Sequence, residues 1–141
     1  MKDMKTVKVA AAVIKDKDRI LIAQRLKGEF KGKWEFPGGK LEENEDAITA
    51  LKREIKEEME ADIETDEYLC NIEHDYETLH LSMDVYICHF LNQNIKLHDH
   101  MAYRWIDPNE QHIDYVPADI KVINHYLDYL NTDIIMKSQL R

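Results

Sequence analysis

The feature that most constrains this chain is a segment with helical periodicity and an acidic edge. Residues 38–63 read GGKLEENEDAITALKREIKEEMEADI: a Gly-Gly pair, an acidic stretch, and then regularly spaced apolar residues. At 3.6 residues per turn, four apolar residues fall within one arc of about 80°. This arc predicts the buried stripe of a helix, formed by Ile48, Leu51, Ile55 and Met59.

Three glutamates of the expected helix share the edge beside that stripe. On the helical wheel, Glu57 lies about 60° to one side of Glu54, and Glu58 about 40° to the other. Clustered carboxylates repel one another, and proton uptake or a divalent cation relieves the repulsion. Mg²⁺ is commonly shared between carboxylates and substrate phosphates. A solvated acidic helix face explains the same residues, so the helix alone leaves both interpretations open.

The residues around the helix form a wider pattern. Its spacing resembles the Nudix box, the signature of the Nudix hydrolase family, and is carried by Gly39, Glu45, Arg53-Glu54-Ile55 and Glu57-Glu58. Only the late Gly-aliphatic pair is missing, because the chain has Glu60-Ala61 there. In the family that glycine helps the chain leave the helix. How this helix ends is therefore an open question.

The resemblance covers about residues 6–130 and implies the Nudix fold, an α+β (α/β/α) sandwich with a mixed β-sheet between helices. The sequence WEFPGGK at residues 34–40 is similar to the MutT-like and CTP-pyrophosphohydrolase-like branch. For that branch the implied reaction converts a nucleoside triphosphate into the monophosphate and pyrophosphate. Expected substrates are 8-oxo-dGTP, another modified nucleotide, or CTP or dCTP. A pyrophosphatase for ADP-ribose and a non-catalytic nucleotide-sensing module are the alternatives.

The resemblance also implies a metal site. Mg²⁺, or Mn²⁺ in its place, would neutralise the polyphosphate and lower the pKa of a bound water. Its ligands would be the Gly38 carbonyl and the carboxylates of Glu54, Glu57 and Glu58. The Gly-Gly pair at 38–39 permits positive φ and a close approach of the backbone to a ligand. A plain turn also fits Pro-Gly-Gly.

Three further residues are expected to support catalysis. Asp99 precedes Trp105 by six positions, as an acidic residue does in MutT-like proteins, where it reaches towards the metal. Either Glu54 or Asp99 would accept the proton of the attacking water. Arg53 would orient the glutamates as their ion-pair partner, with Glu45 supporting it from behind.

Substrate binding is expected at Arg25, Lys40 and Asp119. Arg25 ends an expected strand at residues 19–25 and precedes a basic loop at residues 26–33. Asp119 follows Val116-Pro117-Ala118, where it is either a partner of a helix dipole or, by the resemblance, a reader of the nucleobase. An ionised carboxylate accepts a hydrogen bond from an amine such as cytosine N4, whereas a protonated one also donates.

Composition limits the remaining possibilities. The 141 residues are 44% hydrophobic and 33% charged, which predicts one core and a single domain over residues 1–141. A net charge of −9 disfavours nucleic-acid polymers, which normally need basic patches. The apolar run at residues 9–14 is too short for a signal peptide or a membrane span, so a cytoplasmic protein, monomeric or homodimeric, is expected. Cys70 and Cys88 are expected to be buried free thiols.

The rest of the chain predicts a sheet and a second helix. Strands are expected at residues 6–14, 19–25, 68–73, 78–91 and 103–106, with a short strand entering a turn at 34–40. The second helix would start at Pro117. Its buried face would be Ile120, Ile123, Leu127 and Leu130, and residues 131–141 would be a frayed tail.

Overall fold

The apolar run at residues 9–14 forms the middle of the sheet. The structure, a computed structural model, describes residues 4–92 and 94–139. In it, β1 (Lys5–Asp16) pairs parallel with β6 (Leu79–Phe90) and antiparallel with β2 (Arg19–Arg25). Alternate side chains of β1 enter two separate hydrophobic clusters, one on each face of the sheet. Because both faces are buried, the strand is continuously apolar.

The other strands extend this sheet in both directions. The order is β3-β2-β1-β6-β5, with β4 paired to β1 and β7 paired to β2. The bounds are β3 (Trp34–Glu35), β4 (Gly38–Lys40), β5 (Ile63–Asp75) and β7 (His100–Ile106). Strand β5 starts five residues before the expected strand at 68–73. The Gly-Gly pair lies within β4 and not in a turn, since Gly38 and Gly39 pair with Ala11 and Ala10 of β1.

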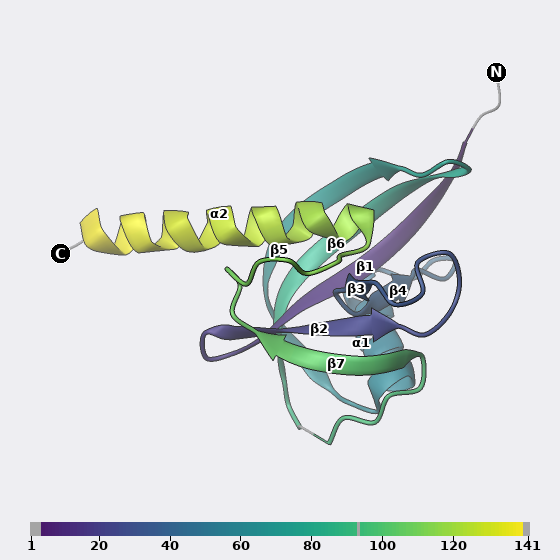
Figure 1. The fold of residues 1–141 in the computed structure, drawn as a ribbon, viewed down its shortest axis with the longest axis horizontal. Coiled ribbons are helices and arrows are strands. Elements are labelled where there is room, and N and C mark those ends of the chain that lie inside the picture. The colour runs from purple at the N-terminus through teal and green to yellow at the C-terminus, as the bar shows by residue number, and fades with distance from the viewer. Residues whose placement is uncertain (1–3, 93, 140–141) are drawn as a thin grey trace.

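One helix covers each face of the sheet (Figure 1). Helix α1 (Ala47–Met59) buries Leu51, Ile55 and Met59 in one cluster. Helix α2 (Pro117–Gln139) buries the first part of its length in the other. A mixed sheet between helices is the expected α/β/α arrangement, and this prediction is confirmed.

Both ends of α1 have a local cause. At its start, Asp46 Oδ1 accepts a hydrogen bond of 2.8 Å from the Thr49 N–H, which caps the helix. At its end, Glu60 takes the left-handed conformation (φ 52°, ψ 36°) that the family's glycine would adopt. The helix therefore ends where the motif predicts, although a glutamate stands there. The buried stripe is confirmed except at Ile48, which is 37% exposed.

Helix α2 corrects two expectations. It continues to Gln139, so residues 131–139 are helical and not frayed. Residues 140–141 of the expected tail lie outside the described residues. No glycine or proline follows Pro117 within the helix to stop it. Ile120 is exposed, although it was expected on the buried face with Ile123, which is buried. Figure 1 shows the second half of α2 extending past the sheet.

The structure also bears on the expected state of the cysteines and on membrane spans. Cys70 and Cys88 are free and buried, as predicted. Neither helix of the described segments combines the length and the apolar content needed to cross a bilayer.

Candidate functional site

A cleft of about 760 Å³ opens between the first turn of α2, the Gly-Gly strand and the loop after β2. Of the nine predicted site residues, seven line it: Arg25, Gly38, Lys40, Glu54, Glu58, Asp99 and Asp119. Arg53 and Glu57 lie outside the lining. Residues from separate parts of the sequence are thus brought to one cavity of the size that small-molecule sites have.

The carboxyl group of Glu58 is the most perturbed group at the α1 side of the cleft. Burial, followed by the nearby charge of Glu54, raises its pKa to about 9. Its Oε2 is buried and has no hydrogen-bond partner within the described residues. A buried carboxylate oxygen without a partner, next to a second carboxylate, fits a hard divalent cation with oxygen ligands.

Glu57 lies apart from this pair. Its side chain is 60% exposed, and its Oε2 accepts a hydrogen bond of 3.4 Å from Arg53 Nη1. Among the described residues, no group of three or more histidine, cysteine, aspartate or glutamate side chains is arranged closely enough to hold a metal ion. The helical wheel places Glu57 and Glu58 on opposite sides of Glu54, and only the Glu58 side is covered by the chain.

That cover is the loop before β7. The His98 N–H donates to the Glu58 carbonyl at 2.9 Å, and the Lys96 N–H donates to the Met59 carbonyl at 3.0 Å. These bonds satisfy carbonyls at the end of α1 that have no partner within the helix. They also bring Asp99 to the cleft, close enough for its charge to contribute to the raised pKa of Glu58.

Arg53 connects the acidic loop, β4 and α1. Its Nε and Nη2 donate to the two carboxylate oxygens of Glu45 at 2.9 and 2.8 Å. Its Nη1 donates to Glu54 Oε1 at 2.9 Å, and its Nη2 to the Lys40 carbonyl at 3.0 Å. The hydrogen bonds from Arg53 lower the pKa of Glu45 to about 2. Arg53 therefore contacts the acidic loop, β4 and Glu54 but is not among the residues that line the cleft.

The two glycines are needed for space and not for positive φ, which neither adopts. A Cβ on Gly39 would collide with the carboxyl group of Glu54, and a Cβ on Gly38 would collide with the backbone of Ala10 and Ala11. The expectation of positive φ is wrong for this pair. The structure shows a close approach to Glu54 and to the β1 backbone, and the expected approach to a ligand stays a prediction. Glycine at 39 lets the Glu54 carboxyl lie directly against the β4 backbone.

The cleft also contains a hydrogen-bonded network of Arg25, Glu35 and His100 that the sequence did not predict. Glu35 Oε1 accepts a hydrogen bond of 3.0 Å from Arg25 Nη1, and Glu35 Oε2 lies 2.8 Å from His100 Nε2. Glu35 stands within WEFPGGK, so the motif itself pointed to its neighbourhood. His100 is separated from it by 65 residues and no local pattern connects the two.

Asp119 lies in the first turn of α2 but bonds across the cleft. Its Oδ2 accepts a hydrogen bond of 2.7 Å from the Phe36 N–H. Burial, and then the charge of Glu35, raises its pKa to about 8. Near neutral pH this carboxyl therefore carries a proton and can both donate and accept. Lys40 is exposed at the rim of the same cleft.

Two aromatic rings form part of the wall. Phe30 and Tyr76 have ring centroids 5.4 Å apart, and both line the cleft. The Tyr76 hydroxyl accepts a hydrogen bond of 3.1 Å from the Ala118 N–H. The wall is thereby tied to the start of α2, next to Asp119.

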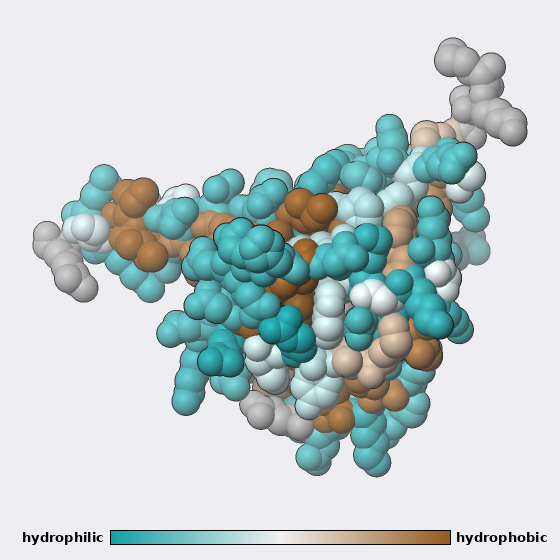
Figure 2. All heavy atoms as spheres, in the orientation of Figure 1, coloured by the Kyte–Doolittle hydropathy of each residue, from teal (hydrophilic) through white to brown (hydrophobic). Residues whose placement is uncertain are grey.

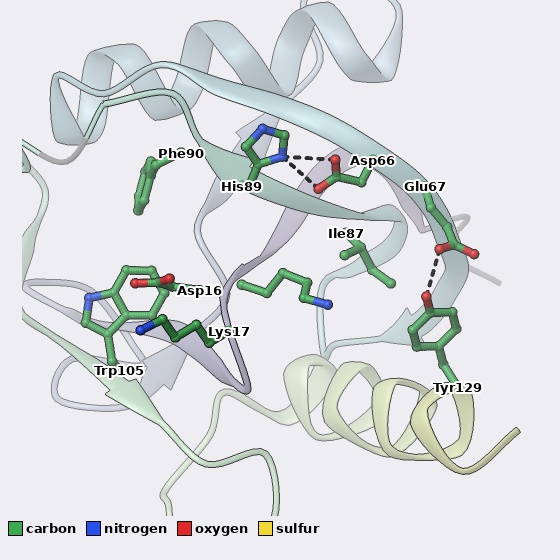
Figure 3. A pocket seen from close by; sticks show the side chains of 10 residues that line it. Asp16, Lys17, Asp66, Glu67, Ile87, His89, Phe90, Trp105 and Tyr129 are labelled. Carbon is green, nitrogen blue, oxygen red and sulfur yellow. Dashed lines mark hydrogen bonds and ion pairs between the residues drawn. The ribbon is translucent and has the colours of Figure 1, made fainter. Parts of the chain in front are cut away.

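A second cavity of about 430 Å³ lies away from the predicted site residues (Figure 3). Its polar side chains largely bind one another: His89 Nδ1 lies 2.9 Å from Asp66, and the Tyr129 hydroxyl donates to Glu67 at 2.7 Å. Because these groups already have partners, the larger cleft is the candidate site.

The chain is similar to known proteins over most of its length. A family model described as the NUDIX domain matches residues 9–124. An 8-oxo-dGTP diphosphatase of Proteus vulgaris is 43% identical over 89 residues, which span 62% of this chain and 80% of that protein. The CTP pyrophosphohydrolase of Escherichia coli (strain K12) is 31% identical over 127 residues, which span 88% and 93%. The solution structure of the E. coli ORF135 protein matches with a TM-score of 0.77 and 30% identity, and covers 89% of this chain and 91% of that chain.

Proposed function

The chain belongs to the Nudix hydrolase family, and from this membership we propose that it is a Mg²⁺-dependent nucleoside triphosphate pyrophosphohydrolase. It would convert a nucleoside triphosphate into the monophosphate and pyrophosphate. The observation that carries the proposal is the pair of carboxylates, Glu54 and Glu58, in a cleft that also contains Arg25 and Asp119.

The acidic end of the cleft would hold the cation. The residues for this are Glu54, Glu58 and the Gly38 carbonyl, with Glu57 joining from the exposed side of the helix. Four oxygen ligands of this kind suit Mg²⁺, and Mn²⁺ prefers similar donors. A cation held by these residues would supply charge neutralisation for the polyphosphate and would lower the pKa of the attacking water.

The protein residues would position this chemistry. Arg53 keeps Glu54 fixed against the acidic loop, so the carboxylate does not reorganise during the reaction. Glu54 or Asp99 would take the proton from the attacking water. Arg25 would face the phosphates, since it lines the cleft and its Nη1 is held in place by Glu35.

The part of the cleft around Asp119 would select the base. The rings of Phe30 and Tyr76 offer apolar surfaces to a planar base, as aromatic side chains do in other nucleotide sites. Asp119, protonated near neutral pH, would pair with a base edge that presents both a donor and an acceptor. Oxidised guanine and cytosine both have such edges, in line with the activities for which the Proteus vulgaris and E. coli relatives are named. We therefore propose 8-oxo-dGTP or a cytidine triphosphate as the substrate.

A nucleotide panel tests this proposal. The purified protein is incubated with Mg²⁺ and with 8-oxo-dGTP, dGTP, CTP, dCTP or ADP-ribose, and the products are separated by chromatography. We expect monophosphate and pyrophosphate from 8-oxo-dGTP or from CTP and dCTP. Turnover of ADP-ribose alone would favour the pyrophosphatase alternative, and tight binding without turnover would favour a sensing module. Glu64→Gln, which removes an exposed carboxylate outside the cleft, is the matched control.

A further inference from the structure

Helix α2 has an apolar stripe that the core of its own chain covers only in the middle. The residues Ile120, Ile123, Leu127, Leu130 and Ile134 follow a spacing of three, four, three and four. On the helical wheel they fall within about 80°. This spacing is the one with which helices pack against other helices along a shared seam. We call these five residues the α2 seam.

Only the middle of the α2 seam is covered by the molecule. Ile123 is buried and Leu127 and Leu130 are half-buried, but Ile120 is 48% exposed and Ile134 is 65% exposed. Figure 2 shows hydrophobic residues gathered on the second half of α2, where the helix extends past the sheet. Because a free helical end with exposed apolar residues is poorly stable alone, we expect another helix to cover it.

The charges along the α2 seam suit a second copy of the same chain. With a net charge of −9, two copies repel each other unless the contact surfaces lack acidic groups. The open side of the seam carries uncharged polar residues, Asn124, Asn131 and Ser138. On the other side, Asp133 and Lys137 neutralise each other through an ion pair of 3.1 Å.

We propose that two copies of this chain form a homodimer in which the α2 helices pair antiparallel, with the two-fold axis near Leu127. Ile120 and Ile134 lie seven residues to either side of Leu127. An antiparallel pair centred there places the exposed Ile134 of each copy against the exposed Ile120 of the other, and the contact is self-complementary as two-fold symmetry requires.

This arrangement would also support the cleft. Ile120 directly follows Asp119, so the helix end of one copy packs beside the first turn of α2 in the other. The dimer does not depend on the proposed activity, since it concerns a surface outside the cleft. Its test measures mass in solution and not turnover.

Sedimentation equilibrium of the full chain over a wide range of concentrations tests the dimer. We expect a mass of about twice 16.7 kDa for the parent protein and a single-chain mass for Ile134→Glu. Met136→Glu is the matched control, because Met136 is also exposed but lies on the opposite side of the helix from the seam. It should leave the dimer intact. Circular dichroism checks that each variant is folded.

A charge exchange tests the orientation. Ile120→Lys alone should also weaken the dimer, whereas Ile120→Lys combined with Ile134→Glu in one chain should restore it, because each lysine then meets a glutamate of the other copy. In a parallel pair each lysine would meet a lysine and each glutamate a glutamate, so the double variant would remain a single chain. A parent protein that is a single chain at all concentrations, or a dimer unaffected by Ile134→Glu, would overturn the proposal.

Discussion

Arg53 holds Glu45 through two parallel hydrogen bonds, from Nε to Oε2 at 2.9 Å and from Nη2 to Oε1 at 2.8 Å. A two-point contact of this kind fixes orientation as well as distance. The same guanidinium bonds Glu54 from the side away from the cleft. The acidic loop is thereby coupled to the position of a carboxylate in the candidate site.

Arg53→Lys should therefore lower activity while the protein stays folded. Lysine keeps the positive charge but has no planar fork, so it cannot hold Glu45 and Glu54 together. We expect a loss of about 10- to 100-fold in turnover or in Mg²⁺ affinity, the range typical for residues that orient metal ligands. Steady-state kinetics at several Mg²⁺ concentrations measures it. Unchanged kinetics in this variant would show that Arg53 has no positioning role.

Glu57→Gln tests whether the exposed glutamate is a ligand. Because its side chain is mostly in solvent, the change should alter the free energy of unfolding by less than about 0.5 kcal/mol. Turnover at limiting Mg²⁺ should nevertheless fall on the order of a hundredfold. If the variant instead matches the parent rate, Glu57 belongs only to the surface ion pairs of Arg53.

Glu60→Gly should stabilise the protein. Glu60 is held at φ 52°, which costs a residue with a Cβ about 1–2 kcal/mol and costs glycine little. Part of this gain is offset by the extra freedom of glycine in the unfolded chain and by loss of the exposed contact with His98. We expect a net increase of up to about 1 kcal/mol in denaturant unfolding, with kcat unchanged. A lower free energy of unfolding would contradict the account of the helix end.

Asp119→Asn should change how stability depends on pH. The unfolded chain ionises this carboxyl near pH 3.8, whereas the folded protein keeps its proton up to about pH 8. Between these values the folded state binds more protons, so the free energy of unfolding falls as pH rises, by about 1.4 kcal/mol per pH unit. Asparagine has no proton to lose and removes this slope.

Melting temperatures of both proteins across the neutral range measure the effect. The advantage of Asp119→Asn over the parent should grow with pH up to about 8. The raised pKa of Glu58 gives both proteins the same additional slope, which cancels in the comparison. A difference in melting temperature that stays constant with pH would mean that Asp119 is ionised in the folded protein.

The sequence predicted the family, the fold class and α1 because these depend on local patterns. Periodicity placed Leu51, Ile55 and Met59 in the core, and the spacing of the motif identified the family. The extent of α2 was predicted wrongly, because residues 131–139 were expected to fray although nothing between Pro117 and Gln139 breaks a helix. The catalytic and binding roles of the site residues stay predictions.

What the sequence did not predict depends on contacts between distant segments. Glu57 and Glu58 are neighbours with the same side chain, yet one is exposed and the other buried, because the loop before β7 covers only one side of α1. The contact between His100 and Glu35 arises in the same way, where β7 and β3 meet across β2. Helical wheels and motif spacing contain no information about which side another segment covers.

The most direct test of the central claim is the rate of pyrophosphate release by Glu58→Gln. In the absence of a cation the Glu58 carboxyl is protonated near neutral pH, and glutamine closely matches a protonated glutamate in size and polarity. If Glu58 is a cation ligand, this variant should keep the parent melting temperature and lose turnover on the order of a hundredfold or more, while Glu64→Gln keeps it. Parent-like turnover of Glu58→Gln in Mg²⁺ would contradict the claim that the α1 carboxylates form the metal site.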